Sequence, residues 1–192
     1  MNTTLSFLRA LLAAPAEVGA LWPSSRHLAQ SMAQAAAACG ANGRVIEVGA
    51  GSGALTLALL TRFGSERLQV VECAPELVQV LRKKFPHLDI RRERIEHFLP
   101  QAAPDPGSSL LVSSLPFKSL PAAQARLLSS TYIRFVQNGG AVIQFSYGLA
   151  PPFALHGVDG LQWQRVSRVW RNLPPACVWR LQATMTDALS PT

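Results

Sequence analysis

The residues best suited to chemistry lie in a glycine-rich stretch, Val-Ile-Glu-Val-Gly-Ala-Gly-Ser-Gly-Ala, at positions 45–54. Gly49, Gly51 and Gly53 stand where a β-branched apolar run is expected to turn into a helix. Glycine is needed there because the turn is tight and because backbone without a Cβ lets a ligand approach closely. The spacing from Gly49 to Ala54 also satisfies the dinucleotide pattern G-x-G-x-x-G/A. The stretch therefore predicts a site for a nucleotide-type cofactor.

Two carboxylates accompany this loop. Glu47 lies two residues before the first glycine, and Glu72 closes the next β-branched run. A carboxylate about 20 residues beyond such a loop can accept hydrogen bonds from both hydroxyls of a ribose. Cys73 follows directly and is expected beside the same cofactor. The glycines and both carboxylates together are a more specific signal than a glycine-rich turn that binds nothing.

Hydrophobic patterning predicts the elements that position these residues. Apolar, β-branched runs predict strands, and stretches with helical periodicity that end at a glycine predict helices. One helix is expected at 26–39, with Ser24 or Ser25 as its N-cap and Gly40 as its stop. The other expected elements are helices at 54–63, 75–85 and from near 121 to just before 139, strands at 44–48, 68–72, 88–91, 110–114 and 141–147, and a flexible loop at 101–109.

The alternation of these strands and helices predicts an α/β fold with right-handed crossovers and a parallel sheet that has helices on both faces. The C-terminal part differs, because the runs 163–170 and 176–181 are separated by a short Arg-Asn-Leu-Pro-Pro turn and no helix. These two runs predict a β-hairpin. Five parallel strands followed by a hairpin make a seven-stranded Rossmann-like sheet, which is not the all-parallel dinucleotide-binding arrangement.

Length and composition favour a single domain spanning 1–192. The chain has 192 residues, 48% of them hydrophobic, so it can bury one substantial core. Its cysteines, Cys39, Cys73 and Cys177, are far apart and form no CxxC pair. They predict neither a disulfide framework nor a metal site, and they suit a reducing compartment.

The charge balance predicts an anionic partner. The formal net charge is +7, with 15 arginines and 3 lysines against 11 acidic residues. Nucleic acid and acidic lipid headgroups are both consistent with this excess, and so is a purely solubilising role. No apolar run of the sequence approaches the ~18 residues that a membrane-spanning helix needs.

The segment 4–14 is expected to form an amphipathic N-terminal helix. Its apolar side is expected to carry Leu5, Phe7, Leu8, Leu11 and Leu12. Its other side is expected to carry Ser6, Arg9, Ala10 and Ala13. Such a helix can lie at a membrane interface, or its apolar stripe can pack on the sheet. The interfacial alternative makes 1–23 a membrane-interacting segment that contacts an anionic surface.

The hairpin and the position of Glu47 resemble class I S-adenosylmethionine-dependent methyltransferases. That class keeps an acidic residue at the end of the first strand, near the amino-acid portion of the cofactor, where nicotinamide-binding loops have an apolar residue. The class also has an acidic residue for the adenine after the third strand. This chain has Arg94 there, so the resemblance leaves Glu93, Glu96 or a backbone contact for that role. The cofactor-binding residues that the resemblance implies are Glu47, Gly49, Gly51, Gly53, Glu72, Cys73 and Ser113.

The segment 113–121, Ser-Ser-Leu-Pro-Phe-Lys-Ser-Leu-Pro, occupies the place where this class positions the methyl acceptor. It resembles the Asn-Leu-Pro-Tyr or Asn-Leu-Pro-Phe motif of rRNA adenine dimethyltransferases, whose Asn grips the adenine amino group. Ser114 replaces that Asn, and the chain leaves no room for the extra C-terminal helical domain of those enzymes. Methylation of nucleic acid is therefore the second hypothesis.

The chain is more similar to bacterial phosphatidylethanolamine N-methyltransferases that have no membrane span. The similarity rests on the glycine loop and on four further segments, 7–26, 114–121, 144–148 and 169–176. The chain departs from that family in having Ser114 before Leu-Pro, where the family usually has glycine, and in its basic Lys118. The resemblance implies methyl transfer from S-adenosylmethionine to a phospholipid amine.

This reaction requires a positioned amine and an acceptor for its proton. The resemblance implies that the backbone carbonyls of Ser114 and Leu115 orient the amine. The ring or hydroxyl of Tyr147 is expected to face the headgroup, which becomes cationic on successive methylations. Four further residues are expected to bind the substrate, with either arginine able to hold the lipid phosphate: Ser25, Arg26, Pro116 and Arg171.

Two hypotheses come from other functional classes. One is a nicotinamide-dependent oxidoreductase, for which the sequence has no Tyr-x-x-x-Lys pair, and the other is a lipid-binding module without catalysis. The preferred hypothesis predicts a cytoplasmic N-methyltransferase that is peripherally associated with the inner membrane.

Overall fold

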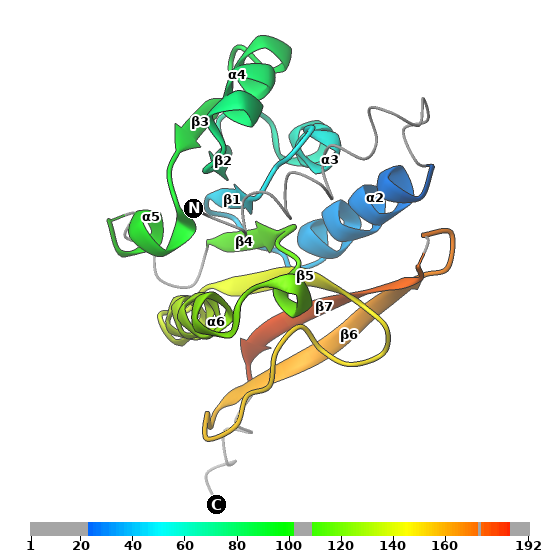
Figure 1. The fold of residues 1–192 in the computed structure, drawn as a ribbon, viewed down its shortest axis with the longest axis vertical. Coiled ribbons are helices and arrows are strands. Elements are labelled where there is room, and N and C mark those ends of the chain that lie inside the picture. Colours follow the sequence, from blue (N-terminus) through cyan, green and yellow to red (C-terminus); the bar gives the residue numbers. More distant parts are fainter. Residues whose placement is uncertain (1–22, 102–108, 173, 185–192) are drawn as a thin grey trace, which may run out of the picture.

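The computed structural model describes residues 23–101, 109–172 and 174–184, which form one seven-stranded sheet (Figure 1). The strand order is β3-β2-β1-β4-β5-β7-β6. The first five strands are parallel, and β7 runs antiparallel to both of its neighbours. The strands are β1 (Val45–Val48), β2 (Leu68–Glu72), β3 (Asp89–Arg92), β4 (Leu110–Ser113), β5 (Ala141–Tyr147), β6 (Leu161–Val169) and β7 (Ala176–Ala183).

Helices cover both faces of this sheet. On one face α2, α3 and α4 enclose a core that contains Met32 and Leu59, and on the other face α5 and α6 enclose a second core around Phe98 and Leu128. The sheet is therefore a buried layer between two helical layers. The helices are α2 (Pro23–Ala37), α3 (Ala54–Phe63), α4 (Pro75–Lys84), α5 (Ile95–Gln101), α6 (Ala122–Gln137) and the short 3₁₀ helix η1 (Phe117–Ser119).

The predicted parallel strands, crossover helices and C-terminal hairpin are confirmed, with their ends shifted by a few residues. The prediction for the start of the second helix is wrong. This helix, α2, begins at Pro23 and ends at Ala37, so Ser24 and Ser25 lie within its first turn and neither is the N-cap. Proline suits the first helical position because its φ is already helical and because an N–H there would have no helical partner.

The sequence did not indicate α5 or η1. The helix α5 has seven residues and contains Pro100, so it is too short to display helical periodicity. The expected amphipathic helix at 4–14 and almost all of the expected loop at 101–109 lie outside the described residues. Within the described part of the chain, no helix has the length and apolar character needed to cross a bilayer.

The burial of the strands explains their composition. β1, β2 and β4 are buried along their whole length, because a parallel sheet covered on both faces has no solvent side. At the other end of the sheet, Tyr147 pairs with Ala176 and Ala176 pairs with Val169. This pairing places the hairpin turn beside the carboxyl end of β5, the edge at which a parallel sheet presents its ligand sites.

The helix α3 that follows the glycine loop gives a direct test of these layers. Leu59 is fully buried and Leu57, on the same helix, is 54% exposed. We expect Leu59→Ala to lower the free energy of unfolding by about 2–5 kcal/mol, because a large core side chain leaves a cavity. Leu57→Ala is the matched control and should change it by less than about 1 kcal/mol. Equal losses in urea-induced unfolding would contradict the described packing.

Candidate functional site

The glycine loop between β1 and α3 needs glycine on two grounds. Gly49, Gly51 and Gly53 have φ values of 71°, 56° and 83°, a region that residues with a Cβ rarely adopt. There is also no space for a side chain at Gly49 or at Gly53. A Cβ at Gly49 would lie 2.9 Å from Cδ2 of Leu115, and a Cβ at Gly53 would lie 2.7 Å from Cε2 of Phe85. The loop is therefore pressed between the segment after β4 and the end of α4.

Glu72 ends β2 beside this loop, as its predicted role requires. Its carboxylate is buried, and Oε2 accepts a hydrogen bond from Gly51 N at 3.2 Å. Oε1 accepts one from Ala74 N at 3.0 Å. Each carboxylate oxygen can accept a second hydrogen bond. The side chain is thus held in place by the backbone and still has capacity for two ligand hydroxyls.

Glu47 is fully buried in β1 and has no hydrogen-bond partner for either carboxylate oxygen. Loss of hydration raises the pKa of this carboxyl to about 8, an effect that the neighbouring Thr56 opposes and the charge of Glu72 reinforces. A buried acidic group without a partner is costly for folding, and such groups occur where a ligand completes them. Glu47 therefore fits a cationic group delivered by a ligand.

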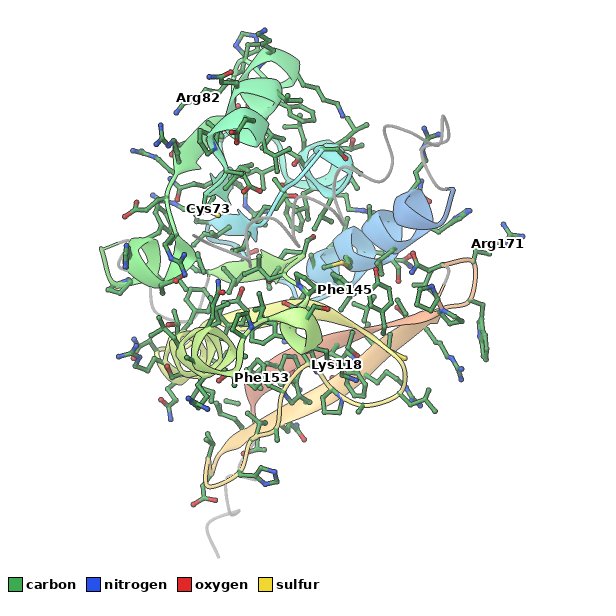
Figure 2. The ribbon with its side chains drawn as sticks, in the orientation of Figure 1. Cys73, Arg82, Lys118, Phe145, Phe153 and Arg171 are labelled. Carbon is green, nitrogen blue, oxygen red and sulfur yellow. The ribbon has the colours of Figure 1, made fainter. Side chains whose placement is uncertain are left out.

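Cys73 follows Glu72 at the same edge of the sheet and is exposed (Figure 2). Partial burial and the adjacent Glu72 carboxylate raise the pKa of its thiol. The thiol is therefore protonated at neutral pH, which favours a packing contact with a ligand over nucleophilic chemistry.

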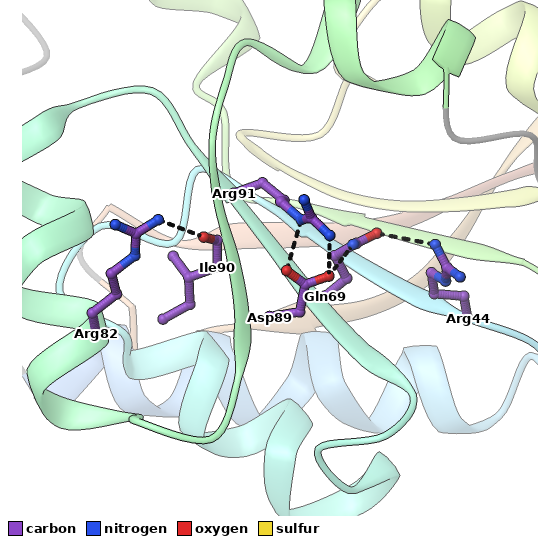
Figure 3. Close-up of polar contacts among 6 residues, drawn as sticks. All are labelled: Arg44, Gln69, Arg82, Asp89, Ile90 and Arg91. Atoms are coloured by element: carbon purple, nitrogen blue, oxygen red, sulfur yellow. Dashed lines mark hydrogen bonds and ion pairs between the residues drawn. The ribbon is translucent and has the colours of Figure 1, made fainter.

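A polar network fixes β3 against β2 (Figure 3). Gln69 on β2 donates to Asp89 on β3 and accepts from Nη1 of Arg44 at 3.4 Å. Arg91 forms an ion pair with Asp89, with 2.7 Å between Nε and Oδ1. Arg82 on α4 donates to a backbone carbonyl of β3 at 3.1 Å. Of these contacts, the one between Gln69 and Asp89 joins β2 to β3, and the strand register places Arg92 at the end of β3 next to Glu72 at the end of β2.

The segment after β3 bears on the adenine contact. Arg94 holds Glu96, with 2.7 Å between Nε and Oε1, and the Glu96 side chain is almost fully buried. Glu93 instead directly follows β3 and donates its backbone N–H to the carbonyl of Glu72 at 3.2 Å. Of the two residues, Glu93 is the one whose backbone is hydrogen-bonded to the predicted ribose residue. The adenine contact remains a prediction.

The segment after β4, predicted to hold the methyl acceptor, lies against the glycine loop. Ser114 N donates to the carbonyl of Val48 at 2.9 Å, and the carbonyl of Leu115 accepts from Nε2 of Gln144 at 2.8 Å. The Ser113 hydroxyl is buried and accepts from Tyr132 at 2.8 Å, so its side chain is directed into the core. The side chain and backbone N of Leu115, rather than the Ser113 hydroxyl, lie against the loop, since a Cβ at Gly49 would be 2.9 Å from Leu115 Cδ2 and 3.9 Å from Leu115 N.

Tyr147 is 38% exposed at the end of β5 and contacts the ring of Phe145 edge to face, with centroids 5.3 Å apart. Partial burial raises the pKa of its phenol, and a hydrogen bond with Asn172 opposes that effect. Lys118, in η1 after β4, donates to the carbonyl of Tyr147 at 3.2 Å and so links the segment after β4 to the end of β5. A shallow pocket here is lined by Pro116, Lys118, Tyr147 and others. Figure 2 labels Lys118 and Phe145, two of the lining residues.

The predicted phosphate ligands are both exposed. Arg26 lies near the start of α2, and Arg171 lies in the hairpin turn. A hydrogen bond of 2.6 Å between the hydroxyls of Ser31 and Ser167 ties α2 to β6, so the start of α2 and the hairpin turn face the same end of the molecule (Figure 1). The side chain of Ser25 lies outside the described residues.

No protein-family model matches the sequence, and no curated protein matches it. Solved structures do match. The N-methyltransferase NodS from Bradyrhizobium japonicum WM9, in complex with S-adenosyl-L-homocysteine, has a TM-score of 0.65 at 17% identity, covering 84% of this chain and 88% of NodS. The 23S rRNA methyltransferase ErmE has a TM-score of 0.57 at 17% identity, covering 85% of this chain and 70% of ErmE. This chain has the class I methyltransferase fold.

A putative RNA methyltransferase, PH1948 from Pyrococcus horikoshii, shares this methyltransferase fold, with a TM-score of 0.55 at 16% identity and 83% coverage of both chains. The neighbours thus include proteins described as acting on RNA and as N-methyltransferases. The seven-stranded sheet and these matches confirm the predicted methyltransferase fold. The matches do not identify the molecule that receives the methyl group.

Sequence reasoning missed three residues that contact the predicted acceptor residues of this chain. Gln144 holds the Leu115 carbonyl, Tyr132 holds Ser113, and Asn172 contacts Tyr147. Each comes from an element distant in the sequence. The only local signal was a polar residue within a buried strand, at Gln144 in β5.

The raised pKa of Glu47 predicts a pH dependence of stability. The folded protein keeps this proton up to about pH 8, whereas the unfolded chain releases it near the ordinary value of 4.5. Folding therefore binds a proton in between, and the contribution of Glu47 to stability falls as pH rises from about 5 to 8. We expect Glu47→Gln to remove that fall, measured by urea unfolding at several pH values. Exposed Glu66→Gln is the control, and parallel curves for Glu47→Gln and wild type would contradict the buried, protonated Glu47.

Proposed function

We propose that this chain is an S-adenosylmethionine-dependent N-methyltransferase that acts on the amine of phosphatidylethanolamine or a related aminolipid. The observation that carries the cofactor assignment is the buried, unpartnered Glu47 below three glycines of positive φ, on a fold shared with NodS in complex with S-adenosyl-L-homocysteine. The α-ammonium of the cofactor is the cation that suits Glu47. The ribose hydroxyls suit Glu72.

S-adenosylmethionine supplies an electrophilic methyl group when bound. The residues of this chain have the remaining tasks, which are to orient the amine lone pair and to accept the amine proton. The carbonyl of Leu115 already accepts hydrogen bonds from Nε2 of Gln144 at 2.8 Å and from Phe117 N at 3.0 Å, so it would offer the amine an oriented dipole rather than a free lone pair. The carbonyl of Ser114 and the Tyr147 hydroxyl are the other proposed amine contacts.

The surroundings of this site support an aminolipid. Lys118 lies within hydrogen-bond distance of the Tyr147 backbone, and Arg171 is exposed in the adjacent hairpin turn. Cations placed beside an amine-binding aromatic suit a phosphodiester that carries its amine two carbons away. Together with the sequence resemblance, they favour a phospholipid headgroup over an adenine base. Membrane association through 1–23 and a cytoplasmic, inner-membrane location belong to the same proposal.

Methylation assays test this proposal. The protein is incubated with radiolabelled S-adenosylmethionine and mixed vesicles of phosphatidylethanolamine and phosphatidylglycerol, and the lipid products are separated. We expect mono-, di- or trimethylated phosphatidylethanolamine. Label transferred only to an rRNA fragment would instead support nucleic-acid methylation. Binding of NAD without binding of S-adenosylmethionine, measured by calorimetry, would support the oxidoreductase hypothesis.

The cofactor role of Glu72 can be tested with Glu72→Gln, which keeps the shape of the side chain and replaces one acceptor oxygen with a donor. We expect S-adenosylmethionine to bind about 10- to 100-fold more weakly, since a hydrogen bond to a charged acceptor contributes ~1.5–3 kcal/mol. The readout is calorimetric affinity, with exposed Glu66→Gln as the control. Unchanged affinity in a folded Glu72→Gln protein would remove this residue from the cofactor site.

The role of Tyr147 separates two mechanisms. If its hydroxyl orients the amine, Tyr147→Phe should lower the rate of lipid methylation nearly as much as Tyr147→Ala. If its ring provides a cation–π face, Phe should keep much of the activity. We expect the hydroxyl to matter at least in part, because a neutral amine needs a hydrogen-bond partner before it carries charge. Wild-type rates in both variants, with unchanged S-adenosylmethionine affinity, would exclude Tyr147 from the site.

A further inference from the structure

Exposed aromatic, aliphatic and basic side chains gather where the hairpin turn meets the carboxyl end of β5. Trp170 is 66% exposed, Leu149 is 57% exposed and Tyr147 is 38% exposed. Two cationic side chains make contacts along this surface: Arg168 lies 3.5 Å from the centroid of the Trp170 ring, and Lys118 donates to the backbone carbonyl of Tyr147. We call this group the hairpin surface; it comprises Lys118, Tyr147, Leu149, Arg168, Trp170 and Arg171.

The part of the chain that forms this surface has almost no negative charge. Residues 109–184 contain seven arginines and lysines and a single acidic residue, Asp159. Asp159 lies just before β6, at the opposite end of the hairpin from its turn. The other basic region, around α4 and β3, differs because its arginines alternate with carboxylates such as Asp89 and Glu96 that pair with them. Among the described residues, the hairpin surface therefore groups Lys118, Arg168 and Arg171 away from the one acidic residue of its segment, which favours an anionic partner.

The apolar residues decide between two anionic partners. Tryptophan beside basic residues is typical of protein surfaces that sit at the headgroup level of a bilayer. Single-stranded nucleic acid needs free aromatic faces on which bases can stack. Here Arg168 covers one face of Trp170. The other strongly exposed apolar residue of this surface, Leu149, is aliphatic, so a base cannot stack on it. The combination of an exposed leucine and a tryptophan with surrounding cations fits a lipid interface better than RNA.

We propose that the hairpin surface docks on an anionic phospholipid bilayer, with Trp170 and Leu149 entering the headgroup region and Arg168, Arg171 and Lys118 facing lipid phosphates. This inference deepens the proposed function and rests on it for the substrate. Docking in this orientation turns the carboxyl edge of the sheet, with the segment 114–116, toward the lipid. An aminolipid then reaches the site directly from the membrane.

The test uses the full chain with Trp170→Ser and Leu149→Ser combined, and vesicles of phosphatidylcholine with phosphatidylglycerol. Both side chains are mostly exposed, so thermal unfolding should stay close to that of the wild type. We expect at least tenfold weaker vesicle binding in sedimentation assays. The matched control combines Leu57→Ser and Leu127→Ser, two exposed leucines on α3 and α6, and should bind within twofold of the wild type. Equal binding by all three proteins would overturn the proposal, as would an equal loss in the control.

Two further measurements separate this inference from the proposed function. The variant should methylate short-chain phosphatidylethanolamine, dissolved as monomers, at the wild-type rate and lose activity only on vesicles. A wild-type protein that methylates no aminolipid, while the variant still loses vesicle binding, would reject the proposed function and keep the docking surface. An RNA oligonucleotide that binds more tightly than vesicles, and whose binding is lost in the variant, would overturn the docking surface itself.

Discussion

The turn after β1 has no room for a side chain at Gly49 or at Gly53, and the geometry of the site follows from that constraint. A side chain at Gly49 would collide with Leu115, and one at Gly53 would collide with Phe85. The turn therefore lies in contact with the segment after β4 on one side and with the end of α4 on the other. Its Gly51 N–H also binds the Glu72 carboxylate. One short piece of backbone thus sets the relative positions of the proposed cofactor and acceptor residues.

Burial of the central strands gives this site its electrostatic character. β1 is covered on both faces, so Glu47 is removed from water without receiving a partner from the protein. A native structure that keeps such a group forgoes some stability, which is common where a ligand must be bound. Glu72, in contrast, is held by two backbone N–H groups. The two carboxylates therefore differ, and this difference suits the proposed roles, in which Glu47 receives a cation and Glu72 accepts hydroxyl hydrogen bonds.

The reversal of the chain at β7 links the cofactor edge to the hairpin surface. An all-parallel sheet would need a helix between its last strands, whereas the antiparallel β7 lets the turn after β6 come back beside Tyr147. Trp170 and Arg171 thereby stand at the edge where the parallel strands end. The feature that separates this sheet from the dinucleotide-binding arrangement also supplies the proposed contact with lipid.

The sequence by itself determined the strands, most of the helices, the hairpin and the cofactor loop, because each depends on local patterns: apolar runs, helical periodicity and glycines at a turn. It missed α5, which is too short for periodicity, and it misplaced the start of α2, where Pro23 and not a serine begins the helix. Only the tertiary structure decided that Gln144 holds Leu115, that Tyr132 turns Ser113 into the core and that the hairpin turn lies at the carboxyl end of β5. These contacts join residues far apart in the chain, and their partners are chosen by strand order and register, which no local pattern encodes.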